Sequence, residues 1–252
     1  MKHNFFLKNY ANIDHMSPYI NHLIDESKEI NLILYNINYE YENNDLINYF
    51  KKKPNVNTKS FKNYLFKKNF LLFLIVKIFN FIKIFIFKYK YLNKLYSYLS
   101  FLNVYITDKH LILYFDNFSN NKKAINFFDY SEDKFKNIKK IKEKININKS
   151  ISINVPHWVW LWKNKSRTFS DFNIKILNNE NFGHIYENDF CIAENNRAEE
   201  ILRFNNVHQN KIIKIGSLRF TEKWINQRDK ISNYKNLGFG SNKDKILFIL
   251  PK

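Results

Sequence analysis

Short apolar runs that alternate with helix-like stretches constrain the fold of this chain most strongly. Runs with the length of a buried strand occur at residues 4–7, 30–35, 110–115, 151–155, 190–193, 211–215 and 245–250. Helical signals lie between them, at residues 17–24, 45–52, 131–145, 197–205 and 221–232. Strands that alternate with helices need crossover connections, and these make a sheet mainly parallel. The predicted fold class is therefore α/β, with a Rossmann-like, mainly parallel sheet and flanking helices.

The first helix is expected to begin at Ser17, a candidate N-cap followed by Pro18 at the first helical position. Thr221 is the expected cap of the last helix. Ligands of such sheets bind beyond the carboxyl ends of the strands. The places to search are therefore the loops after residues 7, 35, 116, 155, 193 and 216.

Rare residue types exclude several kinds of site. Cys191 is the single cysteine, so a disulfide framework and a cysteine-based zinc cluster are excluded; it lies in an apolar run and is expected to be inert core. The four glycines do not form a Walker or GxGxxG phosphate loop. HExxH and G-x-S-x-G motifs and metal-ligand spacings are also absent, and no cofactor is expected.

The net charge of +18 comes from 41 basic and 23 acidic residues. Lysine, asparagine and isoleucine, all with A/T-rich codons, make up 109 of the 252 residues, and the lysines are dispersed. No nucleic-acid partner is expected, because this charge reflects base composition more than a binding face. The five arginines all lie at or beyond residue 167, where a guanidinium can bind phosphate or carboxylate in a two-pronged contact, or form ordinary salt bridges.

An exceptionally apolar segment extends over residues 64–102 and includes NFLLFLIVKIFNFIKIFIF at 69–87. Lys77, Asn80 and Lys83 interrupt it, and their insertion cost cancels most of the gain from the apolar side chains. On a helical wheel most of the polar residues fall in one narrow stripe beside a wide apolar face. This pattern favours a helix in an anionic membrane interface over packing on the domain or spanning the bilayer.

One candidate catalytic residue is His157, in PHWVWLWK at 156–163. Pro156 ends a strand, so His157 sits at its carboxyl end, where an imidazole can accept a proton from an attacking hydroxyl. The neighbouring tryptophans would suit a sugar ring, and Lys163 is a candidate substrate contact. The alternative is a loop histidine beside core tryptophans.

Two further groups are candidate substrate-binding residues. Asp14 and His15 precede the expected first helix and could bind or deprotonate an acceptor; the alternative is that Asp14 caps the helix. Gly216, Ser217 and Arg219 follow the 211–215 strand and could present donors to an anion. The alternative for this group is a plain strand-to-helix turn.

Six segments resemble the N-terminal half of a GT-B-type, two-Rossmann enzyme of surface polysaccharide synthesis. They are FFLKNYANIDHMSPYI (5–20), ILYFDN (112–117), SINVPHW (152–158), DFCIAENN (189–196), KIIKIGSLRFTEKW (211–224) and KILFILPK (245–252). The chain is most similar to bacterial surface carbohydrate biosynthesis proteins, which are related to CDP-glycerol glycerophosphotransferases and to the UDP-N-acetylglucosamine 2-epimerase fold. The resemblance covers most of the chain apart from residues 58–102.

The resemblance implies a membrane-associated transferase. His157 matches the family's catalytic base, although Trp158 stands where glycine is usual. The donor would be a nucleotide-activated sugar or polyol, bound mainly by a C-terminal half, and the acceptor a glycan or lipid-linked glycan. A nucleotide-sugar 2-epimerase and a non-catalytic membrane-surface assembly protein are the alternatives.

The implied domain organisation has three parts. Residues 1–232 form an acceptor-side domain with a helical insertion at about 58–102, 233–244 form a linker, and 245–252 form the first strand of a second Rossmann domain. The start of the chain is too short in apolar residues for a secretory signal. We therefore expect a cytoplasmic protein, peripheral on the inner face of the cell membrane, that is inactive without its second half.

Overall fold

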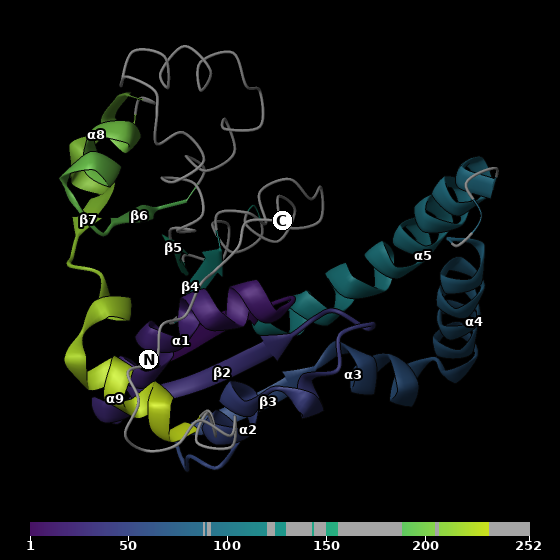
Figure 1. The fold of residues 1–252 in the computed structure, drawn as a ribbon, viewed down its shortest axis with the longest axis horizontal. Helices are drawn as coiled ribbons and strands as arrows, with labels where there is room; N and C mark the ends of the chain where they lie inside the picture. Colours follow the sequence, from purple (N-terminus) through teal and green to yellow (C-terminus); the bar gives the residue numbers. More distant parts are fainter. Residues whose placement is uncertain are drawn as a thin grey trace, which may run out of the picture.

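A computed structural model describes residues 1–87, 89, 92–119, 124–129, 143, 150–155, 188–204 and 207–231. Seven strands of this part form one all-parallel sheet in the order β3-β2-β1-β4-β5-β6-β7 (Figure 1). Helices flank the sheet, so the α/β, Rossmann-like class is confirmed. The strands are β1 (Lys2–Leu7), β2 (Glu29–Leu34), β3 (Val56–Ser60), β4 (Ala124–Asp129), β5 (Ile151–Val155), β6 (Phe190–Ala193) and β7 (Ile212–Lys214).

Five of these strands are the ones that the sequence predicts, and two are not. The prediction missed β3 and β4, and the strand predicted at residues 110–115 is wrong. Those residues belong to helix α5 (Asn93–Ser119). A short apolar run fits a buried helix segment as well as a strand, and only the longer helical stretch around it distinguishes the two. The strand that ends on an acidic residue is β4, which closes on Asp129.

Helix α1 (Tyr10–Asp25) begins eight residues earlier than the predicted start at Pro18. Asn9 is its N-cap, and the Asn9 side chain accepts a hydrogen bond from the backbone of Asn12. Pro18 lies inside the helix, and the hydroxyl of Ser17 donates to the carbonyl of Ile13. The predicted Ser17 cap is therefore wrong, because a better-placed asparagine caps the helix directly after β1.

Three predicted helices are confirmed: α2 (Asp45–Lys51), α8 (Asn196–Phe204) and α9 (Glu222–Ile231). Thr221 precedes α9, and its hydroxyl accepts a hydrogen bond from the backbone of Trp224 at 3.4 Å, as predicted for its cap. Short 3-10 turns occur at η1 (Tyr41–Asn43), η7 (Gln209–Lys211) and η8 (Leu218–Phe220). The helix predicted at 131–145, the linker 233–244 and the strand at 245–250 lie outside the described residues, Glu143 apart.

Two apolar clusters hold the helices onto the two faces of the sheet. On one face, Phe5 and Leu7 of β1 pack with side chains of α1, α2 and α9. On the other face, Phe6 of β1 and Phe128 of β4 pack with side chains of α3 (Phe61–Lys68), α4 (Phe70–Ile86) and α5. Alternate residues of a strand point to opposite faces, so neighbouring phenylalanines of β1 serve different clusters. The predicted core residue Cys191 is buried in β6.

A row of polar side chains crosses the middle of the sheet. Asn4 of β1 is in register with Asn31 of β2 and Asn126 of β4. The Asn31 amide donates to Asn4 and the Asn4 amide donates to Asn126, each at 2.8 Å. A one-residue slip of any strand would move its asparagine to the other face, so this row fixes the register.

The chain between β3 and β4 is helical in its described part and includes the apolar segment. Residues 58–60 of the predicted insertion belong to β3, while the helices continue to Ser119. Helices α4 and α5 pack together as a hairpin that projects from the body of the molecule (Figure 1). None of the helices in the described residues has the length and apolar character to cross a membrane.

Candidate functional site

The sheet changes direction of winding at β1. The chain proceeds from β1 outward through β2 to β3 and then returns to place β4 on the other side of β1. The loops that leave β1 and β4 therefore diverge at their carboxyl ends, and ligands of parallel sheets bind at this switch point. Two features lie there: the N-terminus of α1, directly after β1, and Asp129, the last residue of β4.

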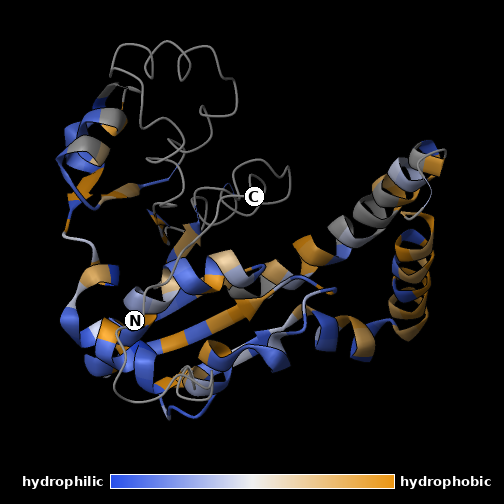
Figure 2. Ribbon diagram, viewed as in Figure 1, coloured by the Kyte–Doolittle hydropathy of each residue, from blue (hydrophilic) through white to orange (hydrophobic). Residues whose placement is uncertain are grey.

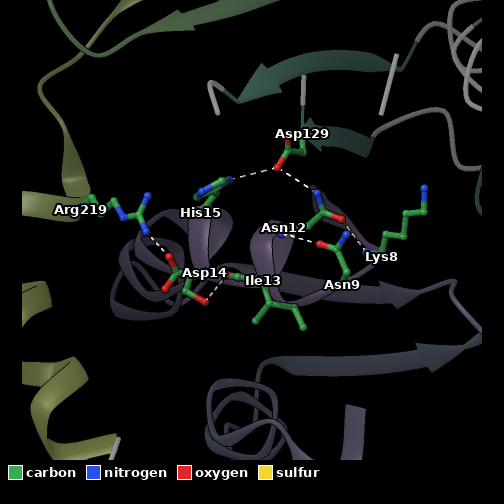
Figure 3. Close-up of polar contacts among 9 residues, drawn as sticks. Lys8, Asn9, Asn12, Ile13, Asp14, His15, Asp129 and Arg219 are labelled. Carbon is green, nitrogen blue, oxygen red and sulfur yellow. Dashed lines mark hydrogen bonds and ion pairs between the residues drawn. The ribbon is translucent and has the colours of Figure 1, made fainter. Parts of the chain in front are cut away.

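A buried polar cluster occupies the switch point (Figure 3). Oδ2 of Asp129 lies 2.9 Å from Nδ2 of Asn12 and 3.3 Å from Nδ1 of His15. All three residues are buried, with exposed fractions of 7% or less. An ionised carboxylate only accepts hydrogen bonds, so in this pair Nδ1 of His15 carries the proton. Asp129 thus fixes both the tautomer and the orientation of the His15 ring.

Asn12 connects this cluster to the first turn of α1. Its Oδ1 accepts a hydrogen bond from the backbone of Lys8 at 3.0 Å, while its amide donates to Asp129. The loop after β1, the start of α1 and the end of β4 are thereby joined by one side chain. The cluster is consequently part of the rigid scaffold, which is where a preorganised site must be built.

Asp14 and His15 are neighbours in sequence but serve different contacts. Successive helical residues point about 100° apart. His15 faces β4, whereas Asp14 forms an ion pair with Arg219 of η8 (Figure 3). Asp14 also forms an ion pair with Arg228 of α9, at 2.7 Å. Two predicted site residues, Asp14 and Arg219, are thus brought together, but as a partly buried ion pair that ties η8 to α1.

The third predicted group consists of Gly216, Ser217 and Arg219, in the turn after β7. Gly216 is exposed, and a Cβ there would meet nothing within 4 Å, so the turn does not require glycine. Ser217 is half-buried at the start of η8, and its hydroxyl makes no hydrogen bond within the described part of the chain. Of this group, only Arg219 reaches the switch-point region, through Asp14.

A tyrosine–carboxylate contact lies at the carboxyl end of β6. The hydroxyl of Tyr19 on α1 donates to Oε1 of Glu194, directly after β6, at 2.9 Å. Burial, and then the charge of Glu194, raise the pKa of Tyr19 well above its ordinary value. Tyr19 is therefore a hydrogen-bond donor at neutral pH and has no role as a base.

Several residues of the cluster are absent from the sequence-based set. Asp129 closes the run AINFFD, an apolar stretch that ends in a carboxylate, which is the same signal that misdirected the prediction to residues 110–116. Asn12 and Glu194 lie in the segments 5–20 and 189–196 that carry the resemblance; Glu194 is a weaker signal because acidic residues commonly close strands, and no motif singles out Asn12. The candidate base His157, its neighbour Trp158 and the candidate contact Lys163 lie outside the described residues.

The chain was compared with protein-family models, with curated proteins and with solved structures, and none of them matched. An imidazole oriented by a carboxylate is the arrangement used to bind or deprotonate a hydroxyl. Among the described residues, no three His, Cys, Asp or Glu side chains gather as metal ligands.

Proposed function

We propose that this chain is the acceptor-side domain of a membrane-associated transferase of surface polysaccharide synthesis. It would move a sugar or glycerophosphoryl unit from a nucleotide-activated donor to a lipid-linked glycan. The observation that carries the proposal is the Asp129–His15 pair at the carboxyl end of β4, on a Rossmann-like sheet. The resemblance to GT-B-type enzymes supplies the reaction class.

In the proposed reaction an acceptor hydroxyl attacks the donor at carbon or phosphorus. The new bond to the hydroxyl oxygen forms as the bond to the nucleotide's phosphate leaving group breaks. A histidine takes the hydroxyl proton, and His157 is the candidate for this base. His15, held by Asp129, would bind an acceptor hydroxyl, since oriented side chains bind a hydroxyl with little loss of entropy.

Acceptor binding tests this proposal on the full 252-residue chain. The probe is a lipid-linked N-acetylhexosamine in detergent micelles, with binding measured by titration calorimetry. We expect His15→Ala to weaken binding about tenfold, the value of one well-placed hydrogen bond to a ligand. His22→Ala is the matched control, because His22 lies exposed at the far end of the same helix.

Two results would overturn the proposal. One is the absence of acceptor binding by the unchanged chain, and the other is equal binding by His15→Ala and His22→Ala. Conversion of UDP-N-acetylglucosamine to its 2-epimer without acceptor would instead establish the epimerase alternative.

A further inference from the structure

Helix α4 is oriented with its apolar side outward. Its most exposed side chains are all apolar, and they recur at helical spacing along one stripe, at Phe70, Leu71, Leu74, Ile78, Phe81, Ile82, Ile84 and Phe85. Phe81, in the middle of the stripe, is 74% exposed. Figure 2 shows the same helix as largely orange on the projecting hairpin. A patch of this extent on an exposed helix marks an interaction surface.

Two of the three polar residues of α4 contact other elements of the protein, whereas the third, Lys77, is half-buried and lies over a ring of its own helix. Asn80 donates a hydrogen bond to Asn38, in the loop after β2, and the Lys83 ammonium lies 5.6 Å from the ring centroid of Tyr96 on α5. Partial burial there lowers the pKa of Lys83. Val76 and Ile86 are the buried apolar residues of the helix. The outward stripe is therefore not a by-product of a poorly packed helix, since α4 has a defined inner face with its own contacts.

The charge around this stripe is of one sign. Residues 46–107 contain twelve lysines and no Asp or Glu, so no acidic side chain of this segment offsets the positive charge of the lysines on α3, α4 and α5. In the described part of this segment, Lys67, Lys68 and Lys94 are exposed near the ends of the stripe. A second copy of this surface would bring the same positive charge against itself, which disfavours self-association.

The geometry points to one partner: we propose that the outward face of α4 inserts into the surface of an anionic lipid bilayer. A bilayer offers an apolar interior for the stripe and negative headgroups for the surrounding lysines. The hydrogen bond between Asn80 and Asn38 places α4 against the loop at the carboxyl end of β2. Docking would therefore hold the carboxyl edge of the sheet near the lipid.

This inference deepens the proposed function and rests on it for its purpose, because a lipid-linked acceptor is reached at the membrane surface. The two can nevertheless fail separately. Vesicle binding depends on the α4 stripe and acceptor binding depends on His15, so each is measured with its own variant.

Co-sedimentation of the full chain with vesicles tests the inference. The vesicles are phosphatidylcholine with 30% phosphatidylglycerol, compared with pure phosphatidylcholine (about one anionic lipid in three gives a strongly negative surface). The variants are Ile78→Glu and its matched control Ile225→Glu on α9, since Ile78 is 47% and Ile225 46% exposed. We expect Ile78→Glu to weaken binding to the anionic vesicles about tenfold. Ile225→Glu should leave the binding within about twofold, because the residue lies outside the stripe.

Folding is controlled by circular dichroism and a urea titration, and exposed positions such as these tolerate the change. The unchanged chain should also bind more weakly to pure phosphatidylcholine, because that surface carries no net negative charge. Binding to the anionic vesicles should weaken in 0.5 M salt, because salt screens the attraction between the lysines and the headgroups. Equal binding by the two variants would refute the inference, and so would failure of the unchanged chain to sediment. A dimer in gel filtration that Ile78→Glu dissociates, without vesicle binding, would show that a second copy covers the stripe.

Discussion

The ring of His15 lies 3.3 Å from the carboxylate of Asp129, a residue 114 positions further along the chain. This contact joins the second turn of α1 to the last residue of β4, and both side chains are buried. A histidine with a buried carboxylate partner has one fixed tautomer and one fixed orientation. The pair is the best-organised polar group at the switch point of the described sheet.

A double-mutant cycle measures the coupling between these two residues. Asp129→Ala should lower the free energy of unfolding by about 2 kcal/mol, because Asn12 and His15 both lose a buried acceptor. The coupling between His15→Ala and Asp129→Ala should be about 1 kcal/mol, as for residues in one network. Urea denaturation of the four proteins gives the values. Additive single effects would mean that the pair does not act as a unit.

The Asp14 ion pairs should contribute to stability because they are partly shielded from water. The side chains of Arg219 and Arg228 are 20% and 29% exposed, and that of Asp14 is 8% exposed. Asp14→Ala leaves both guanidinium groups without this carboxylate, and we expect a loss of about 2 kcal/mol after allowing for solvent screening. The urea midpoint and the rate of proteolysis within α9 report the loss.

Asp25 supplies the control for this prediction, because it also lies on α1 and also pairs with a basic residue of α9. Its partner Lys223 lies 2.9 Å away, but that side chain is 73% exposed. Exposed pairs contribute little, so Asp25→Ala should leave the urea midpoint unchanged. Equal midpoints for the Asp14 and Asp25 variants would contradict a stabilising role for the Asp14 contacts.

The row of asparagines across the sheet, Asn31, Asn4 and Asn126, predicts that an apolar substitution within it lowers the stability of the protein. Asn4→Leu removes the acceptor of Asn31 and the donor to Asn126, both in the sheet interior. Leaving the buried Asn126 and the half-buried Asn31 without these partners should lower the free energy of unfolding by about 2 kcal/mol. Asn57, in register with Asn31 on the edge strand β3, is exposed and is the control. Asn57→Leu should change stability by less than about 0.5 kcal/mol, and a similar loss in both variants would refute a special role for the row.

His3 should make the stability of the protein depend on pH. Burial lowers its pKa below the ordinary value of 6.5, with smaller contributions from the N-terminal amine and Lys28. The unfolded chain therefore binds a proton at a higher pH than the folded chain. The contribution of a neutral His3 to the free energy of unfolding is fully present above about pH 6.5. This contribution is lost as the pH falls from 6.5 toward the lower pKa of His3 in the folded protein. Urea denaturation from pH 7.5 to 5 should show this loss, and His3→Asn should reduce it. Parallel curves for the two proteins would contradict the prediction.

The sequence alone predicts the class of the fold and five of the seven strands described. Runs such as 151–155 and 190–193 are short and are bounded by polar or turn-forming residues, and such length and flanks favour a buried strand over a helix segment. The run at 110–115 misleads, since residues on both sides of it continue as the helix α5. The start of α1 is misplaced for a similar reason, as Asn9 and Ser17 are both chemically able to cap a helix.

Tertiary structure alone decides which polar side chains meet. Sequence places Asp14 beside His15 and suggests one site, but helical geometry separates them, and each finds a partner more than a hundred residues away. Tertiary structure also decides that the apolar side of α4 faces outward, because Asn80 and Lys83 of that helix contact other elements of the protein. Local patterns record what each segment can form. The pairing of distant side chains depends on how the strands and helices assemble, and a linear pattern does not contain that information.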